Sequence, residues 1–124
     1  MTYLLVAVGA AVGAPVRYLF DRWVQQRFLP VFPWGTFTVN VVGSLLLGGL
    51  AAAAAYGGLP EAGLALLGAG FCGGLTTFSS FGWETHRLLD EGADWVATVN
   101  VLASTGVCLA AAGISWAVTS AALA

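Results

Sequence analysis

A cluster of hydroxyls, glycines and aromatic rings lies between Gly70 and Phe81, with the sequence GFCGGLTTFSSF. It occupies the middle of an uncharged stretch from Ala62 to Trp83, which is long enough to cross a bilayer. Backbone that leaves helical geometry inside hydrocarbon needs protein, an ion or water to replace its lost hydrogen bonds. A span interrupted at its own centre is therefore the first place to look for chemistry.

The polar side chains inside the apolar segments are all neutral, and each is costly there unless it finds a partner or lines a cavity. Donors without positive charge suit a small anion that must pass through, because a buried arginine would hold it too tightly for release. Fluoride is the extreme case, since it is small, strongly hydrated and needs several close donors to shed its water. The neutral polar residues are Asn40, Ser44, Thr76, Thr77, Ser79, Ser80, Asn100, Ser104 and Thr105.

Phe78 and Phe81 stand three residues apart beside the expected break. The edges of aromatic rings are positively polarised and can add weak contacts to an anion. Aromatic residues at this spacing in a membrane helix are also typical of ordinary packing, and the spacing alone leaves both interpretations open.

The titratable residues do not favour an enzyme. Group transfer needs a nucleophile, a base or a set of metal ligands, and the chain offers one histidine, His86, with Glu84 and scattered charges at span ends. We expect no carboxylate at bilayer depth, which argues against a proton-coupled transporter. A net charge of −2 without a basic run gives no indication of a nucleic-acid partner.

The composition places these residues in a membrane protein. Of 124 residues, 59% are hydrophobic and 8% charged, whereas a soluble domain has roughly a quarter charged residues. We predict an all-α protein with a single domain, residues 1–124, of four transmembrane helices, with the third broken at its centre. The predicted spans are about 3–20, 34–56, 62–83 and 95–119. The connections between them collect nearly all the charge and Pro30, Pro33 and Pro60.

Small residues recur at a spacing of four, as in Gly9 with Gly13 and Gly70 with Gly74. This spacing lets helix backbones approach closely. Four short helices enclose too little interior for a wide aqueous path, so we expect the close contacts to build an oligomer, at least a dimer.

Three blocks, which together extend over most of the chain, resemble the signature motifs of the CrcB/Fluc fluoride channels. The third block is highly specific, and the order and spacing of all three fit that family. The blocks are GAAVGAPVRY at residues 9–18, PWGTFTVNVVGS at 33–44 and GFCGGLTTFSSFGWE at 70–84.

The resemblance implies an antiparallel, dual-topology dimer with two fluoride pores along its interface, in the prokaryotic cell membrane. It implies that the pair Phe78 and Phe81 faces fluoride and that Asn40 donates its amide in the same pore. Hydroxyls around the break and polar residues of the fourth helix would complete the lining, with Asn100 a departure from the family's tyrosine. Those residues are Thr77, Ser79, Ser80, Asn100 and Ser104, and the charged residues expected near the pore mouth and the first helix are Glu84 and Arg17.

The resemblance also implies a structural sodium ion between the subunits, held by the backbone carbonyls of Gly73 and Thr76 from each. Carbonyls freed by a broken helix do need a cation or donors. Threonine hydroxyls or water closing the gap is the alternative that the residues alone leave open.

The arginines bear on orientation. Arg17, Arg22, Arg27 and Arg87 all lie toward one side of the four-span arrangement, which favours a single orientation with both termini outside. An antiparallel homodimer needs half of its subunits inserted the other way. We expect the homodimer, and pairing with an oppositely oriented relative is the alternative.

Two other classes of function compete with a channel. A small four-helix multidrug exporter is also short and dimeric, but it relies on a membrane carboxylate to exchange protons. A structural subunit of a larger complex would explain the size and glycine content without transport. The hydroxyls and rings between Gly73 and Phe81 argue against both.

Overall fold

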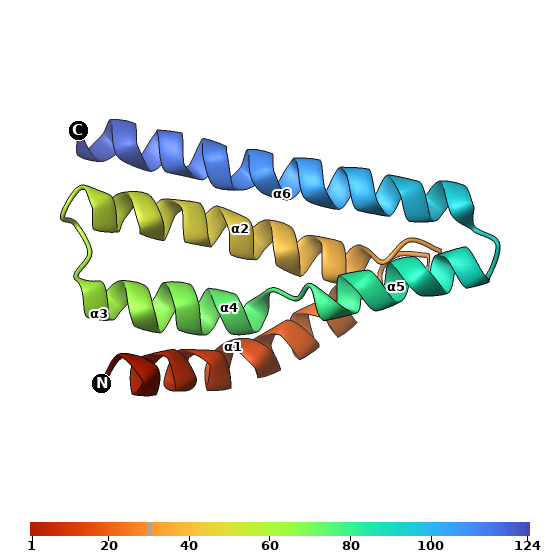
Figure 1. Ribbon diagram of the computed structural model, residues 1–124, viewed down its shortest axis with the longest axis horizontal. Coiled ribbons are helices and arrows are strands. Elements are labelled where there is room, and N and C mark those ends of the chain that lie inside the picture. Colours follow the sequence, from red (N-terminus) through yellow and green to blue (C-terminus); the bar gives the residue numbers. More distant parts are fainter. Residues whose placement is uncertain (30) are drawn as a thin grey trace.

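The four expected membrane crossings are present in a computed structural model that describes residues 1–29 and 31–124 (Figure 1). Pro30, expected in the first connection, lies outside the described residues. Helix α1 is Thr2–Gln25, α2 is Trp34–Ala55 and α6 is Asp94–Leu123, while the third crossing, 61–90, is composite. Both chain ends lie at the same end of the bundle.

The third crossing is interrupted near its middle, as predicted. It starts as α3, Glu61–Gly63, continues through the π-helical segment η1, Leu64–Cys72, and ends its first half in α4, Gly73–Leu75. The chain turns to extended geometry at Thr76, with φ −84° and ψ 157°. Helix α5, Ser79–Asp90, forms the second half. The break is thus confined to residues 76–78, and the glycines before it remain helical.

Two helices extend past the predicted ends of their spans. Helix α1 continues beyond Phe20 to Gln25, and α5 continues beyond Trp83 to Asp90. Arg22 and Glu84, expected in connections, therefore lie inside helices. A helix satisfies its own backbone hydrogen bonds at the membrane surface as well as in hydrocarbon, so charged side chains at that depth do not end it.

The paired glycines pack inside the subunit. A Cβ atom added at Gly9 would collide with the backbone of Leu66 and lie 2.9 Å from the Cα of Gly70, and one at Gly74 would lie 2.9 Å from the Ala10 carbonyl oxygen. Helix α1 thus lies directly against η1 and α4. The expectation that these close contacts join subunits was wrong for Gly9, Gly13, Gly70 and Gly74, because each of these glycines already packs against the backbone of a neighbouring helix in the same chain.

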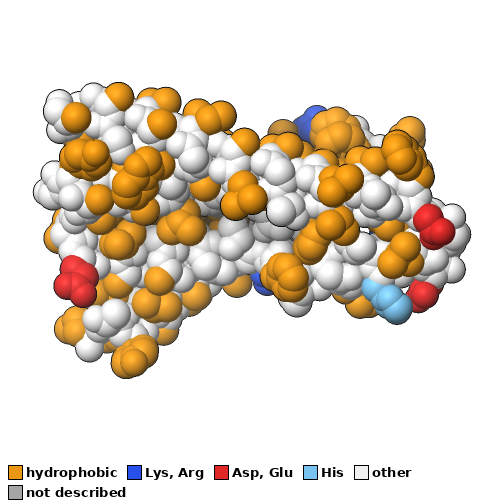
Figure 2. All heavy atoms as spheres, turned by 45° about the horizontal axis from the view of Figure 1, so that its top comes forward, with side chains coloured by type: hydrophobic (Ala, Val, Ile, Leu, Met, Phe, Trp, Pro, Cys, Tyr) orange, Lys and Arg blue, Asp and Glu red, His pale blue; other side chains and the backbone are white. Residues whose placement is uncertain are grey.

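The remaining helices are arranged around α2, which lies between α6 and the first half of the third crossing (Figure 1). On the face that Figure 2 shows, hydrophobic side chains are widespread and charged ones are few, and large hydrophobic side chains such as Leu4, Leu102 and Leu109 are mostly exposed. A surface of this kind suits a lipid environment.

Candidate functional site

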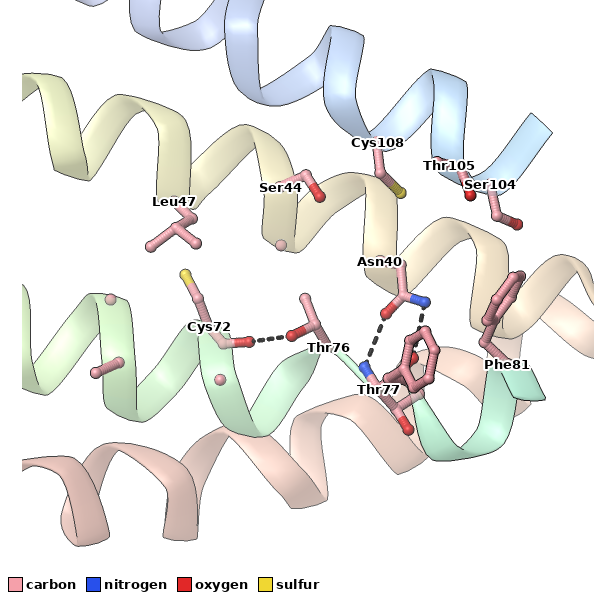
Figure 3. Close-up of a pocket in the computed structure, with 15 residues that line it drawn as sticks. Asn40, Ser44, Leu47, Cys72, Thr76, Thr77, Phe81, Ser104, Thr105 and Cys108 are labelled. Atoms are coloured by element: carbon pink, nitrogen blue, oxygen red, sulfur yellow. Dashed lines mark hydrogen bonds between the residues drawn. The ribbon is translucent and has the colours of Figure 1, made fainter. Parts of the chain in front are cut away.

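A cavity of about 430 Å³ opens beside the break in the third crossing (Figure 3). Helices α2 and α6 form one wall, and η1, α4 and the first turn of α5 form the other. Every residue that lines it is uncharged: Asn40, Gly43, Ser44, Leu47, Gly68, Ala69, Cys72, Gly73, Thr76, Thr77, Phe78, Phe81, Ser104, Thr105 and Cys108.

Asn40 holds the break in place. Its side-chain Nδ2 donates to the Thr77 carbonyl oxygen at 3.0 Å, and its Oδ1 accepts from the Thr77 backbone N–H at 2.8 Å (Figure 3). One amide side chain on α2 thereby replaces both hydrogen bonds that Thr77 loses by leaving the helix. The second N–H of the Asn40 amide is not needed for this contact.

The flanking residues close the rest of the interruption. Thr76 terminates α4 through two hydrogen bonds, since its N–H and its hydroxyl both donate to the Cys72 carbonyl at 2.9 Å. The Thr77 hydroxyl accepts from the Ser80 N–H at 3.2 Å and so caps the start of α5. Arg17, on α1, donates from Nη1 to the Thr76 carbonyl at 3.4 Å. Arg17 therefore lies beside the break itself.

The aromatic pair lines the same cavity. The ring centroids of Phe78 and Phe81 are 5.7 Å apart at an interplanar angle of 48°. Phe78 is 82% exposed in the subunit, so apart from its contact with Phe81 little of its side chain packs against this chain. This exposure weakens the interpretation of the pair as ordinary core.

A second cavity, of about 870 Å³, lies on another side of α5 and is charged. It contains the hydroxyl residues Ser79 and Ser80, whereas Thr77 lies on the first cavity. The predicted hydroxyls are thus divided between two cavities, and the Thr77 and Ser79 oxygens are 3.3 Å apart. The remaining lining residues are Asp21, Arg22, Gln25, Gln26, Pro33, Trp83, Glu84 and Arg87.

Glu84 belongs to this second cavity and is fixed to α2. The Thr36 hydroxyl donates a hydrogen bond to the Glu84 carboxylate. Close by, the Gly35 N–H in the first turn of α2 donates to the Gln25 side chain at 3.2 Å. The ends of α1, α2 and α5 are therefore joined by polar contacts around the charged cavity.

Asn100 and Ser104 lie together on α6, as expected, but with a partner that sequence reasoning missed. Asn100 is 1% exposed and its Nδ2 donates to the Thr85 hydroxyl at 2.8 Å. Ser104 donates to the Asn100 Oδ1 at 3.1 Å and lines the first cavity. A threonine one turn after Phe81 carries no signal of this contact, because the contact depends on how α5 meets α6.

A metal at this site would depend on backbone oxygens. Within residues 1–29 and 31–124, no group of three or more His, Cys, Asp or Glu residues is arranged to hold an ion. Gly73 fits the sodium expectation in one respect, since a Cβ there would meet no atom within 4 Å and its backbone borders the open cavity. The Thr76 carbonyl is oriented to accept from Arg17 in this subunit.

Comparison with known proteins bears on the whole chain. A Frankia casuarinae protein named fluoride-specific ion channel FluC 1 is 50% identical over 126 residues, which cover 98% of each chain. A Streptomyces avermitilis protein of the same name is 52% identical over 112 residues, or 90% of each chain. A Geobacter sulfurreducens protein named fluoride-specific ion channel FluC is 46% identical over 109 residues, covering 87% of this chain and 88% of that one.

These relatives and the four apolar crossings identify a multi-pass protein of the bacterial cell membrane. The family model described as CrcB-like protein, camphor resistance (CrcB), matches residues 4–116. The resemblance of the three sequence blocks is thereby confirmed, and the chain belongs to the CrcB family.

Proposed function

We propose that the protein is a passive, fluoride-selective channel that lets fluoride leave the cell and so prevents its toxicity. One observation carries the proposal: a helix break held by the Asn40 amide at an uncharged cavity lined by two exposed or half-exposed rings. The names of the relatives support fluoride as the ion. The lining contains no carboxylate and no histidine that could exchange a proton near neutral pH, which fits passive flow.

The two cavities suggest how the ion is handled. In the charged cavity Arg22 and Arg87 lie beside the carboxylates of Asp21 and Glu84, so the charges balance and the two arginines steer anions without holding them. At the break the ion exchanges water for neutral donors, among them the hydroxyls of Ser79 and Ser80 and the free N–H of Asn40. The edges of Phe78 and Phe81 then face the ion on its way along the first cavity.

The channel is proposed to be an antiparallel homodimer. The first cavity is open on the side where Gly73 and Phe78 are exposed, and a second subunit would close it. A sodium ion between the two breaks would be held by the Gly73 and Thr76 carbonyls of both chains. When bound, the ion would supply a fixed positive charge that these carbonyl oxygens coordinate.

The test is an ion-flux assay on purified protein in liposomes. Fluoride efflux, read with a fluoride electrode and started by a potassium ionophore, is expected to follow the electrical gradient in either direction. Chloride flux under the same gradient is expected to be negligible. Comparable chloride flux would refute selectivity, and a requirement for an opposing proton gradient at fixed voltage would show a coupled exporter.

A further inference from the structure

The second half of the third crossing is joined to its neighbours by few polar contacts. Helix α5 carries Phe81 in its first turn and follows directly on Phe78, so its position sets both rings. Neighbouring residues on α5 make its side-chain bonds to other helices: Glu84 reaches Thr36 on α2, and Thr85 reaches Asn100 on α6. Together with the buried Leu88, these two contacts fix how α5 lies against α2 and α6.

The contact with α6 is a directed chain of hydrogen bonds. The Thr85 hydroxyl donates its only proton to the Phe81 carbonyl at 2.8 Å, so it must accept from Asn100. This fixes the Asn100 amide with Nδ2 toward Thr85 and Oδ1 toward the hydroxyl proton of Ser104. Each member has the single orientation that the next one requires.

Burial separates Asn100 from the ion pathway. Ser104 borders the first cavity, whereas Asn100 lies one helical turn away, 1% exposed and outside the lining of both cavities described above. Both polar atoms of its side chain are engaged by protein groups. An ion could reach the amide only by breaking this chain, at the full cost of leaving buried groups unpaired.

We propose that Asn100 is a positioning residue that acts through Thr85, holding α5 against α6 and thereby placing the Phe78 and Phe81 rings at the cavity. This inference rests on the proposed function as a fluoride channel. It gives Asn100 a different role from the pore donor that the sequence resemblance implied, since the amide does not touch the ion.

A double-mutant cycle in liposomes tests the coupling. Asn100→Ala and Thr85→Val are each expected to lower fluoride flux about tenfold, because each leaves a buried partner unpaired. The double variant should be no slower than either single variant, and Thr85→Ser, which keeps the hydroxyl, should conduct normally. The matched control is Thr98→Val, since Thr98 also donates to a carbonyl four residues back, at 2.9 Å, but on the exposed side of α6.

A second measurement reports position without relying on conduction. With 4-fluorophenylalanine incorporated at position 81 alone, ¹⁹F NMR of detergent-solubilised protein should shift or broaden in Asn100→Ala and Thr85→Val, and not in Thr98→Val. Unchanged resonances in both Asn100→Ala and Thr85→Val would overturn the proposal. So would normal flux in Thr85→Val combined with lost flux in Asn100→Ala, which would mean that Asn100 contacts the ion directly. If the unmodified protein itself fails to conduct, the channel function is wrong, and the NMR comparison still decides the role of Asn100.

Discussion

The Asn40 side chain makes two hydrogen bonds that a carboxylate cannot make together. Its Oδ1 accepts from the Thr77 N–H while its Nδ2 donates to the Thr77 carbonyl. In Asn40→Asp the donor is lost, an oxygen faces the Thr77 carbonyl, and a negative charge enters a neutral cavity. We expect fluoride flux to disappear and the free energy of unfolding to fall by about 1–3 kcal/mol. Flux in liposomes and melting in detergent measure the two effects, and normal flux would assign Asn40 to packing.

The aromatic pair provides a second residue-scale prediction. Phe78→Ile and Phe81→Ile keep apolar volume but remove the polarised ring edge. Phe78 is so exposed that its replacement should leave subunit stability unchanged. Each variant should lower fluoride flux sharply while eluting as the unmodified protein does in size-exclusion chromatography. Unimpaired flux in both would mean that the rings merely fill the interface.

Individual residues of the site were predictable to different degrees. The family resemblance pointed to Asn40, Phe78 and Phe81, and the structure brings all three to one cavity. The division of the hydroxyls was not predictable, because whether Ser79 shares a cavity with Thr77 depends on the direction in which α5 leaves the break. Thr85 was missed for the same reason.

Among the helices, the close contact between α1 and the first half of the third crossing offers the most direct test of packing. An added methyl at Gly9 would collide with backbone atoms that cannot rotate away. Gly9→Ala should therefore cost about 1–3 kcal/mol through overpacking. Its control is Gly113→Ala on α6, where a Cβ meets no atom of the subunit within 4 Å. Thermal melting in detergent should separate the two, and equal melting temperatures would contradict this packing.

The existence of the helical elements was easier to predict than their details. Apolar runs of about 20 residues fix the four crossings, since lipid leaves few alternatives for the backbone. The break was expected somewhere between Gly73 and Phe81, and it falls at residues 76–78. Gly70 and Gly74 were predicted to let helix backbones approach closely, and they do so against α1 of the same chain. Only the three-dimensional neighbour distinguishes glycine packing within a subunit from packing between subunits.

At the scale of the whole molecule, a substitution at Gly73 distinguishes the folding of the subunit from the assembly of the dimer. A side chain at Gly73 has open space within the subunit, so Gly73→Val should leave the subunit folded. The same side chain should block a partner that approaches the exposed backbone, and with it any shared cation. We expect monomers in light scattering and no fluoride flux. A dimeric, conducting Gly73→Val protein would place the partner elsewhere.

The arginines are distributed unevenly along the bundle. Arg17 and Arg22 lie in the later part of α1 and Arg87 in the last turn of α5, at the end of the bundle away from both termini (Figure 1). Arginine on one side only favours one insertion direction. Arg17 is partly satisfied by the Thr76 carbonyl and Arg87 stacks over the Trp83 ring at 5.2 Å, which leaves a weaker orientation signal than the raw count indicates.

The antiparallel homodimer therefore predicts a mixed population. A single cysteine introduced as Thr2→Cys, in a chain with Cys72→Ala and Cys108→Ala, marks the end of the bundle that carries both termini. In sealed vesicles an impermeant thiol reagent should label one fraction at once and the remainder only after permeabilisation. Complete labelling from one side, in a preparation that conducts fluoride and contains no other homologue, would mean a parallel assembly, because subunits inserted in one direction cannot pair antiparallel.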